Sequence, residues 1–138
     1  MAQSIENTQI IVSFIFVGLI WTIQLAHYPS FHYVRKERFI EFEKFHTFRI
    51  LLLVAPLMFL ELVSSLALLY LNSFRLHEII VLIIVALLWF VTFYWSVPCH
   101  KKLLKGKDKA VIDTLINTNW IRTFLWTLKV FIVYFIYY

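Results

Sequence analysis

Three of the five histidines lie at the ends of long hydrophobic stretches, where polar residues from different helices can share one pocket. His27 ends the first stretch, His46 precedes the second and His100 follows the third. Asn119 and Arg122 stand at the start of the fourth stretch. An imidazole can move protons at neutral pH, and a guanidinium with an amide can hold an anionic oxygen. We therefore predict catalytic roles for these five residues.

The same imidazoles are candidate ligands of a metal or a haem. Neutral imidazole binds Zn, Cu and Fe, including haem iron, so His27, His46 and His100 are candidate cofactor ligands. Glu43 and His46 form a Glu-x-x-His pair on one helix face and, with His100, are candidate metal ligands. One such motif is too few for a carboxylate-bridged di-iron site. A single transition metal, a haem between two helices and purely structural histidines at a membrane interface remain alternatives.

Two opposite charges stand deeper in the hydrophobic stretches. Glu61 lies within the second stretch and Lys129 within the fourth. Ionisable residues inside a membrane are costly and normally face the interior of a bundle. We predict a buried Glu61–Lys129 pair that pins the second helix to the fourth. The functional alternative is a proton relay in a small transporter.

The elements that must position these residues are four transmembrane helices. The chain has 138 residues, of which 62% are apolar or aromatic and 15% charged. Soluble domains usually have about 45–50% apolar and about 25% charged residues, so the composition excludes a soluble enzyme, a nucleic-acid-binding module and a disordered chain. Hydrophobic stretches near 9–27, 50–71, 79–97 and 120–138 each approach the roughly 20 residues that span a bilayer. We predict an all-α, four-helix transmembrane bundle in one domain, residues 1–138.

The basic residues predict how this bundle lies in the membrane. Ten of the 13 Lys and Arg residues fall in the segments 29–49 and 98–119, which an even number of spans places on one side. Basic loops are cytoplasmic, so both termini should face the exterior of the inner membrane. Residues 31–46 alternate phenylalanines with charges, which predicts an amphipathic helix on the surface or an extension of the second span. Asp108 is placed to cap the last helix.

Five short sequence motifs are distributed over nearly the whole chain. They are Tyr28-Pro29-Ser30-Phe31, Phe39-x-x-Phe42-x-x-x-His46, Pro56-Leu57-Met58 with Glu61, Val97-Pro98-Cys99-His100, and Asn119-Trp120-Ile121-Arg122-Thr123. Together they resemble an uncharacterised family of small bacterial four-helix membrane proteins. This resemblance implies the same four-helix fold and names no reaction.

The layout is also remotely similar to the anthrone-oxygenase-like membrane family and to the small haem-binding protoporphyrinogen oxidase. Both resemblances imply oxidation of a hydrophobic aromatic or tetrapyrrole substrate. We therefore expect an oxidoreductase-like membrane enzyme acting on a lipophilic small molecule, with its polar pocket at the cytoplasmic mouth. The alternatives are a proton-coupled transporter and a non-catalytic accessory subunit, and a homodimer is compatible with each.

Overall fold

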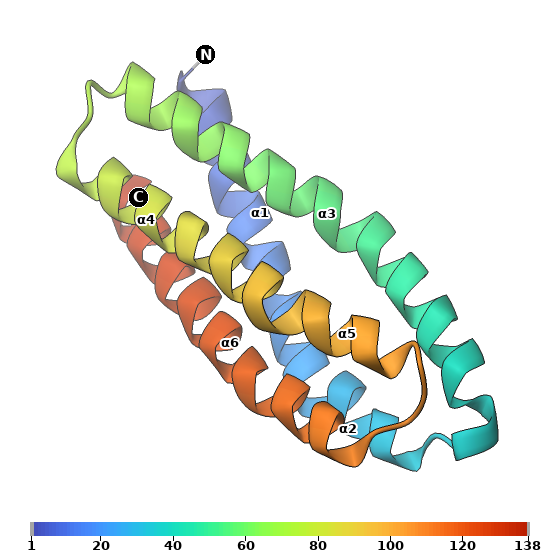
Figure 1. Ribbon diagram of the computed structural model, residues 1–138. Coiled ribbons are helices and arrows are strands. Elements are labelled where there is room, and N and C mark those ends of the chain that lie inside the picture. The colour runs from blue at the N-terminus through green and yellow to red at the C-terminus, as the bar shows by residue number, and fades with distance from the viewer. Residues whose placement is uncertain (1, 138) are drawn as a thin grey trace.

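The computed structural model describes residues 2–137, which form helices and short connections without a strand. The helices combine into four long rods, and successive rods run in opposite directions (Figure 1). In chain order the elements are α1 (Ala2–Thr22), η1 (Ile23–His27), α2 (Tyr28–Ser30), η2 (Phe31–Tyr33), η3 (Lys36–Arg38), α3 (Phe39–Leu71), α4 (Leu76–Val91), η4 (Thr92–Ser96), α5 (Val97–Leu103) and α6 (Lys109–Tyr137).

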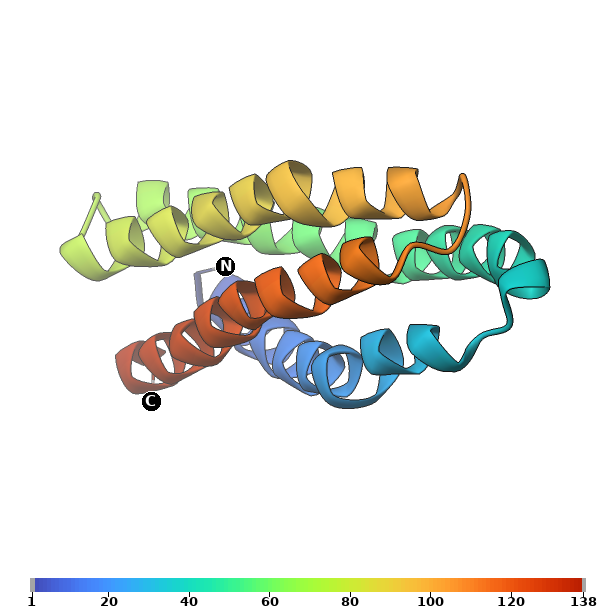
Figure 2. The same cartoon turned by 60° about the horizontal axis from the view of Figure 1, so that its bottom comes forward.

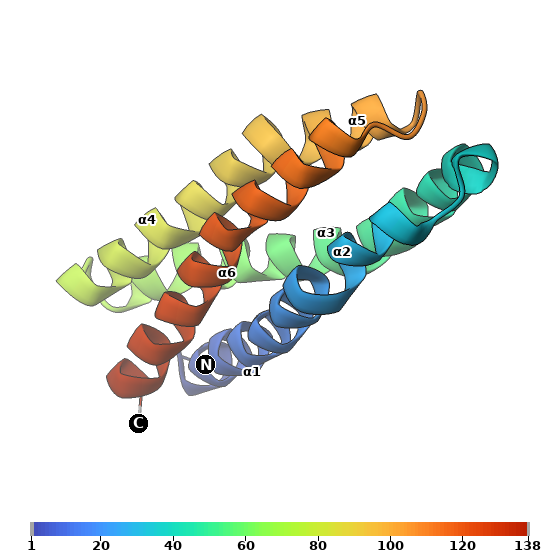
Figure 3. The same cartoon turned by 90° about the horizontal axis from the view of Figure 1, so that it is seen from below.

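The four predicted hydrophobic stretches are confirmed as four helical rods that are long and apolar enough to cross a membrane. The rods run over Ala2–Tyr33, Lys36–Leu71, Leu76–Leu103 and Lys109–Tyr137, so they extend well past the predicted stretches. The predicted amphipathic segment 31–46 is divided between two rods. Phe31–Tyr33 ends the first rod, and the residues from Lys36 onward extend the second, which is one of the two predicted forms. Figures 2 and 3 show both basic connections at one end of the bundle and both termini toward the other end.

Polar side chains point into the bundle and large apolar side chains point out of it. Glu61 and Lys129 have no exposed surface, whereas Phe59, Phe124 and Phe131 are 63%, 66% and 57% exposed. Inside, α1 packs against α3 and α6, and α4 packs against the same two helices. Exposed apolar surface of this extent is unusual for a monomer in water, so it suggests a membrane protein.

Two π-helical turns interrupt the rods just before prolines. The turns η1 and η4 each lead into an α-helical segment with proline in its first turn, Pro29 in α2 and Pro98 in α5. Proline has no N–H, and its ring clashes with the carbonyl four residues earlier. These carbonyls belong to Leu25 and Tyr94, which lie within the wider π turns. The extra residue in each turn rotates the helix that follows, and single π turns often occur at functional sites.

The two basic connections are tied to each other. Lys107 Nζ donates hydrogen bonds of 2.7 Å to the carbonyl oxygens of His32 and Val34. His32 Nε2 lies 2.9 Å from Asp113 Oδ1 on α6. These contacts hold the segment after α2 against the start of α6, so the end of the bundle that carries the histidines is fixed by side chains as well as by helix packing.

The predicted cap of the last helix forms, because Asp108 Oδ1 accepts a hydrogen bond of 3.2 Å from Val111 N. Replacing this side chain leaves a helix N–H without its acceptor. We expect Asp108→Ala to lower the free energy of unfolding by about 0.5–2 kcal/mol. Thermal unfolding in detergent measures the loss, and Asp108→Ser, which keeps an acceptor, is the control. Equal stability of all three proteins would contradict a stabilising cap.

Candidate functional site

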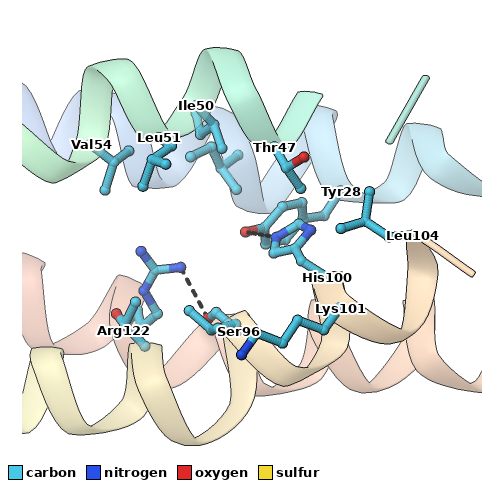
Figure 4. A pocket seen from close by; sticks show the side chains of 13 residues that line it. Tyr28, Thr47, Ile50, Leu51, Val54, Ser96, His100, Lys101, Leu104 and Arg122 are labelled. Atoms are coloured by element: carbon cyan, nitrogen blue, oxygen red, sulfur yellow. Dashed lines mark hydrogen bonds between the residues drawn. The ribbon is translucent and has the colours of Figure 1, made fainter. Parts of the chain in front are cut away.

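A cavity of about 260 Å³ lies between α3 and the η4–α5 segment, with Tyr28 and Arg122 contributed by α2 and α6 (Figure 4). Most of its wall is apolar, which is typical of sites for small organic molecules. The polar groups in the wall are few and come from four rods. The lining residues are Ile23, Tyr28, Thr47, Ile50, Leu51, Val54, Thr92, Ser96, Val97, His100, Lys101, Leu104 and Arg122.

A carboxylate, an imidazole and a phenol form a hydrogen-bonded chain at one end of the cavity. Glu43 Oε1 lies 2.6 Å from His100 Nδ1, and His100 Nε2 lies 3.3 Å from the Tyr28 hydroxyl. A carboxylate can only accept, so Nδ1 of His100 carries the proton and Nε2 of a neutral ring accepts from Tyr28. Glu43 is fully buried, so it orients the ring in the way that a carboxylate orients the histidine of a hydrolytic triad.

Arg122 supplies a buried positive charge to the cavity wall. Its Nη1 donates hydrogen bonds of 3.2 Å to Ser96 Oγ and to Asn119 Oδ1, and its Cζ lies 5.0 Å from the centre of the Trp126 ring. Its Nε is buried without a hydrogen-bond partner. Within residues 2–137 no acidic side chain forms an ion pair with this guanidinium.

Asn119 acts on the site through Arg122, because it is fully buried and does not line the cavity. Its Nδ2 donates a hydrogen bond of 2.8 Å to Gln24 Oε1, and Gln24 Nε2 donates one of 3.2 Å to the carbonyl of Ile116. These bonds fix which way the Asn119 amide points, so that its oxygen faces Arg122. Gln24 of η1 thereby helps to position the guanidinium through Asn119.

His27 and His46 form a second pair behind the chain of Glu43, His100 and Tyr28. His27 Nε2 lies 2.7 Å from His46 Nδ1, and the His46 and His100 rings are 5.1 Å apart between centroids. Neither His27 nor His46 lines the cavity. His46 Nε2 and Glu43 Oε2 are both buried without a hydrogen-bond partner.

The side chains do not fit a metal ion or a haem in this arrangement. Both ring nitrogens of His100 are hydrogen-bonded, and His27 and His46 are bonded to each other. Over the described part of the chain, no group of three or more His, Cys, Asp and Glu side chains is arranged to hold a metal. Although Glu43 and His46 share a helix face, the carboxylate turns to His100 and the imidazole to His27.

The structure brings the predicted site residues to one end of the bundle, where some of them line the cavity and others do not. His100 and Arg122 line the cavity, whereas His27, His46 and Asn119 lie behind its wall. Tyr28 and Ser96 also line it, and the sequence did not single them out as site residues. Two sequence signals point to them: Ser96 lies four residues before His100 on the same helix face, and Tyr28 directly precedes Pro29, where a helix often changes its geometry.

A second polar cluster, consisting of Gln9, Ser13, Glu61, Trp126 and Lys129, lies deeper in the bundle. Lys129 Nζ lies 2.9 Å from Glu61 Oε1, 2.7 Å from Ser13 Oγ and 3.3 Å from Gln9 Oε1. Trp126 Nε1 donates to both Glu61 oxygens at 3.2 and 3.3 Å. The cluster joins α1, α3 and α6. The charged pair lines neither the cavity described above nor a second, smaller cavity, which lies between α1, α3 and α6 and is bordered by Arg122 and Trp126.

No protein-family model, curated protein or solved structure matches this chain, so its own geometry carries the functional argument.

Proposed function

We propose that this chain is an integral membrane enzyme that acts on a lipophilic small molecule in the cavity between α3 and α5. One observation carries the proposal. The chain of Glu43, His100 and Tyr28 ends in the wall of a largely apolar cavity that also exposes the guanidinium of Arg122. Groups that transfer a proton and a group that stabilises an oxyanion therefore face the same small volume.

In the proposed reaction His100 takes a proton from the substrate, directly or through the hydroxyl of Tyr28. Arg122 stabilises the negative charge that develops on the substrate oxygen, and Asn119 keeps the guanidinium in place. Removal of a proton from a hydroxyl or an enol prepares an aromatic or conjugated molecule for oxidation. An oxidoreductase of this kind needs an electron acceptor, which a separate molecule would supply. Oxidation of a conjugated substrate is also the chemistry implied by the remote resemblance to the anthrone-oxygenase-like family and to the small protoporphyrinogen oxidase.

The proposed membrane is the inner membrane, with the histidine-bearing end in the cytoplasm and both termini outside. The argument is the position of the basic residues in the segments 29–49 and 98–119 at one end of the bundle. The 33 residues of α3 measure about 50 Å at 1.5 Å per residue, which exceeds a hydrocarbon core of about 30 Å. The end of α3 with Glu43 and His46 would therefore reach the cytoplasmic boundary.

Single-cysteine labelling tests this orientation. Cys99 is buried and is the only cysteine, so Cys99→Ser gives a background without thiols. On that background we expect an impermeant maleimide to label Ser73→Cys from outside the cell and Lys105→Cys only in inside-out vesicles. Leu128→Cys, on the outward face in the middle of α6, should stay unlabelled on both sides. Labelling of positions 73 and 105 from the same side would overturn the four-span arrangement.

The catalytic proposal is tested with lipids from the cells that produce the protein. Purified protein in lipid nanodiscs is incubated with a total lipid extract, and mass spectrometry compares the compounds before and after. We expect at least one lipophilic compound to be consumed by the native protein and to persist with His100→Ala. No difference between the two proteins, or a stoichiometric haem or metal in the purified native protein, would count against the proposed chemistry.

The transporter alternative receives no supporting observation. Glu61 and Lys129 are fully buried, their polar atoms bond to one another and to neighbouring side chains, and they line neither cavity. A carrier that used them would have to open α1, α3 and α6 at their tightest polar contacts.

A further inference from the structure

We propose that the ligand of this cavity is a single-chain amphiphile with a carboxylate head, such as a long-chain fatty acid. Its carboxylate would bind Arg122, and its hydrocarbon chain would leave between α3 and α5 into the surrounding lipid. The inference rests on the membrane location proposed above, and it gives the same cavity a second use, in which Arg122 binds a carboxylate head instead of the oxyanion of the proposed reaction. It depends on three observations: the charge of the cavity, its hydrogen-bond donors and the place where it opens.

An anionic ligand would balance the positive charge in the cavity wall. Arg122 is 4% exposed and carries no ion pair with an acidic side chain among residues 2–137. The cavity wall contains Lys101 as a second cation and no Asp or Glu. A buried charge without a counter-ion costs several kcal/mol, so an anionic ligand would stabilise the site. The buried Nε of Arg122, which has no hydrogen-bond partner, is part of this unsatisfied charge.

The donors around Arg122 suit a carboxylate. A guanidinium binds the two oxygens of a carboxylate through parallel hydrogen bonds. The Ser96 hydroxyl accepts from Arg122, so its own proton is available to a ligand oxygen. One buried guanidinium balances a single negative charge, whereas a phosphomonoester brings about 1.5–2 charges at pH 7. Lys101 is exposed at the mouth and is not part of the buried donor set.

The cavity reaches the surface between α3 and α5, where the proposed membrane location would bring lipid against Leu51. Leu51 and Lys101, which stand at its rim on α3 and α5, are both exposed, and these two helices make few contacts there. The volume of 260 Å³ is below the range of about 300–1,000 Å³ that encloses a drug-sized ligand. A carboxylate and the first part of a chain would therefore be enclosed, and the rest would lie along exposed apolar residues such as Leu52.

In Figure 4, Leu51 and Val54 line the α3 side of the cavity. Arg122 points from α6 into the space below them, and Tyr28 and His100 close the other end. A carboxylate on Arg122 would thus place the first carbons of the chain against Leu51 and Val54, with the hydroxyl of Tyr28 and the ring of His100 near the head.

Equilibrium binding of radiolabelled palmitate to the purified full chain in nanodiscs tests the inference. We expect saturable binding of palmitate, and binding of hexadecanol, which has the same chain without a charge, at least about 30-fold weaker. Arg122→Gln should weaken palmitate binding by about 30-fold or more, since it removes one partner of a buried charge pair. Arg75→Gln, at the opposite end of the bundle, should bind like the native protein.

Two further variants separate a lost site from a misfolded protein. Arg122→Lys keeps the charge but not the bidentate geometry, so it should bind with intermediate affinity. Val54→Trp fills the cavity from α3 and should abolish binding while Arg122 is intact. Native affinity in Arg122→Gln, equal affinity for hexadecanol, or tighter binding of hexadecyl phosphate than of palmitate would each overturn the inference.

The outcome is distinguishable from that of the proposed function. Palmitate binding that depends on Arg122, without consumption of any compound from the lipid extract, would support the inference and count against the enzyme. Consumption that depends on His100, with no binding of palmitate, would support the enzyme and overturn the carboxylate ligand.

Discussion

Replacing Lys129 by methionine is expected to lower the free energy of unfolding by about 3–5 kcal/mol, the usual cost of removing one partner from a buried ion pair. The loss arises because Glu61 stays fully buried and loses the 2.9 Å contact that compensates its charge. Trp126 Nε1 still donates to Glu61, but a single neutral donor does not replace an ammonium group. Unfolding of the detergent-solubilised protein, followed by tryptophan fluorescence, measures the change.

The double variant Glu61→Gln with Lys129→Met is the informative control for the pair. The amide introduced by Glu61→Gln is neutral and keeps an oxygen that can accept from Trp126, so no charge would be left buried without a partner. We expect the double variant to recover more than half of the stability lost by Lys129→Met. Lys102→Met, on an exposed position of α5, should change stability by less than about 0.5 kcal/mol. A loss below about 1 kcal/mol for Lys129→Met would contradict a stabilising role of the pair.

The second large effect is expected on turnover of the compound that the native protein consumes. His100→Ala should reduce the rate by about 10²–10⁴-fold, the usual contribution of a general acid or base. Glu43→Gln should reduce it by at least about tenfold, because an amide can hydrogen-bond to Nδ1 of His100 without fixing the tautomer. Both rates are measured by mass spectrometry of the lipid extract in nanodiscs.

A second histidine serves as the control, because its replacement shows whether loss of any imidazole lowers the turnover rate. His77 stands at the start of α4, at the other end of the bundle, where its Nε2 lies 3.5 Å from Glu78 Oε1 and its side chain lines neither cavity. His77→Ala should therefore retain the native rate. The proposed role of His100 would be refuted if His100→Ala kept more than about a third of the activity, or if His77→Ala lost as much.

The helices and the direction of their polar faces are accessible from the sequence. Long hydrophobic runs predict rods, and Glu61 and Lys129, which were predicted to face the interior, are both fully buried. The even number of rods places both basic segments at one end (Figure 1). The rods are longer than the hydrophobic stretches, because polar residues in 31–46 and 98–119 continue the helices beyond them.

The pairing of side chains at the site could not be predicted from spacing. Glu43 and His46 share a helix face, which suggested one metal, yet Glu43 bonds to His100 and His46 bonds to His27. Helical periodicity fixes which residues share a face. It does not fix the rotation and separation of neighbouring helices, and a change of about one ångström decides which donor reaches which acceptor.

The sequence by itself determined four apolar rods, the inward position of their polar residues and the gathering of His27, His46, His100 and Arg122 toward one end. Only the tertiary structure decided that Tyr28 and Ser96 join the site and that, among the described residues, Arg122 faces a cavity without an acidic partner. The physical reason is the rotation of short helical segments next to the site. The π turns before Pro29 and Pro98 rotate the segments that carry Tyr28 and His100, and this rotation depends on how the helices pack as well as on the prolines themselves.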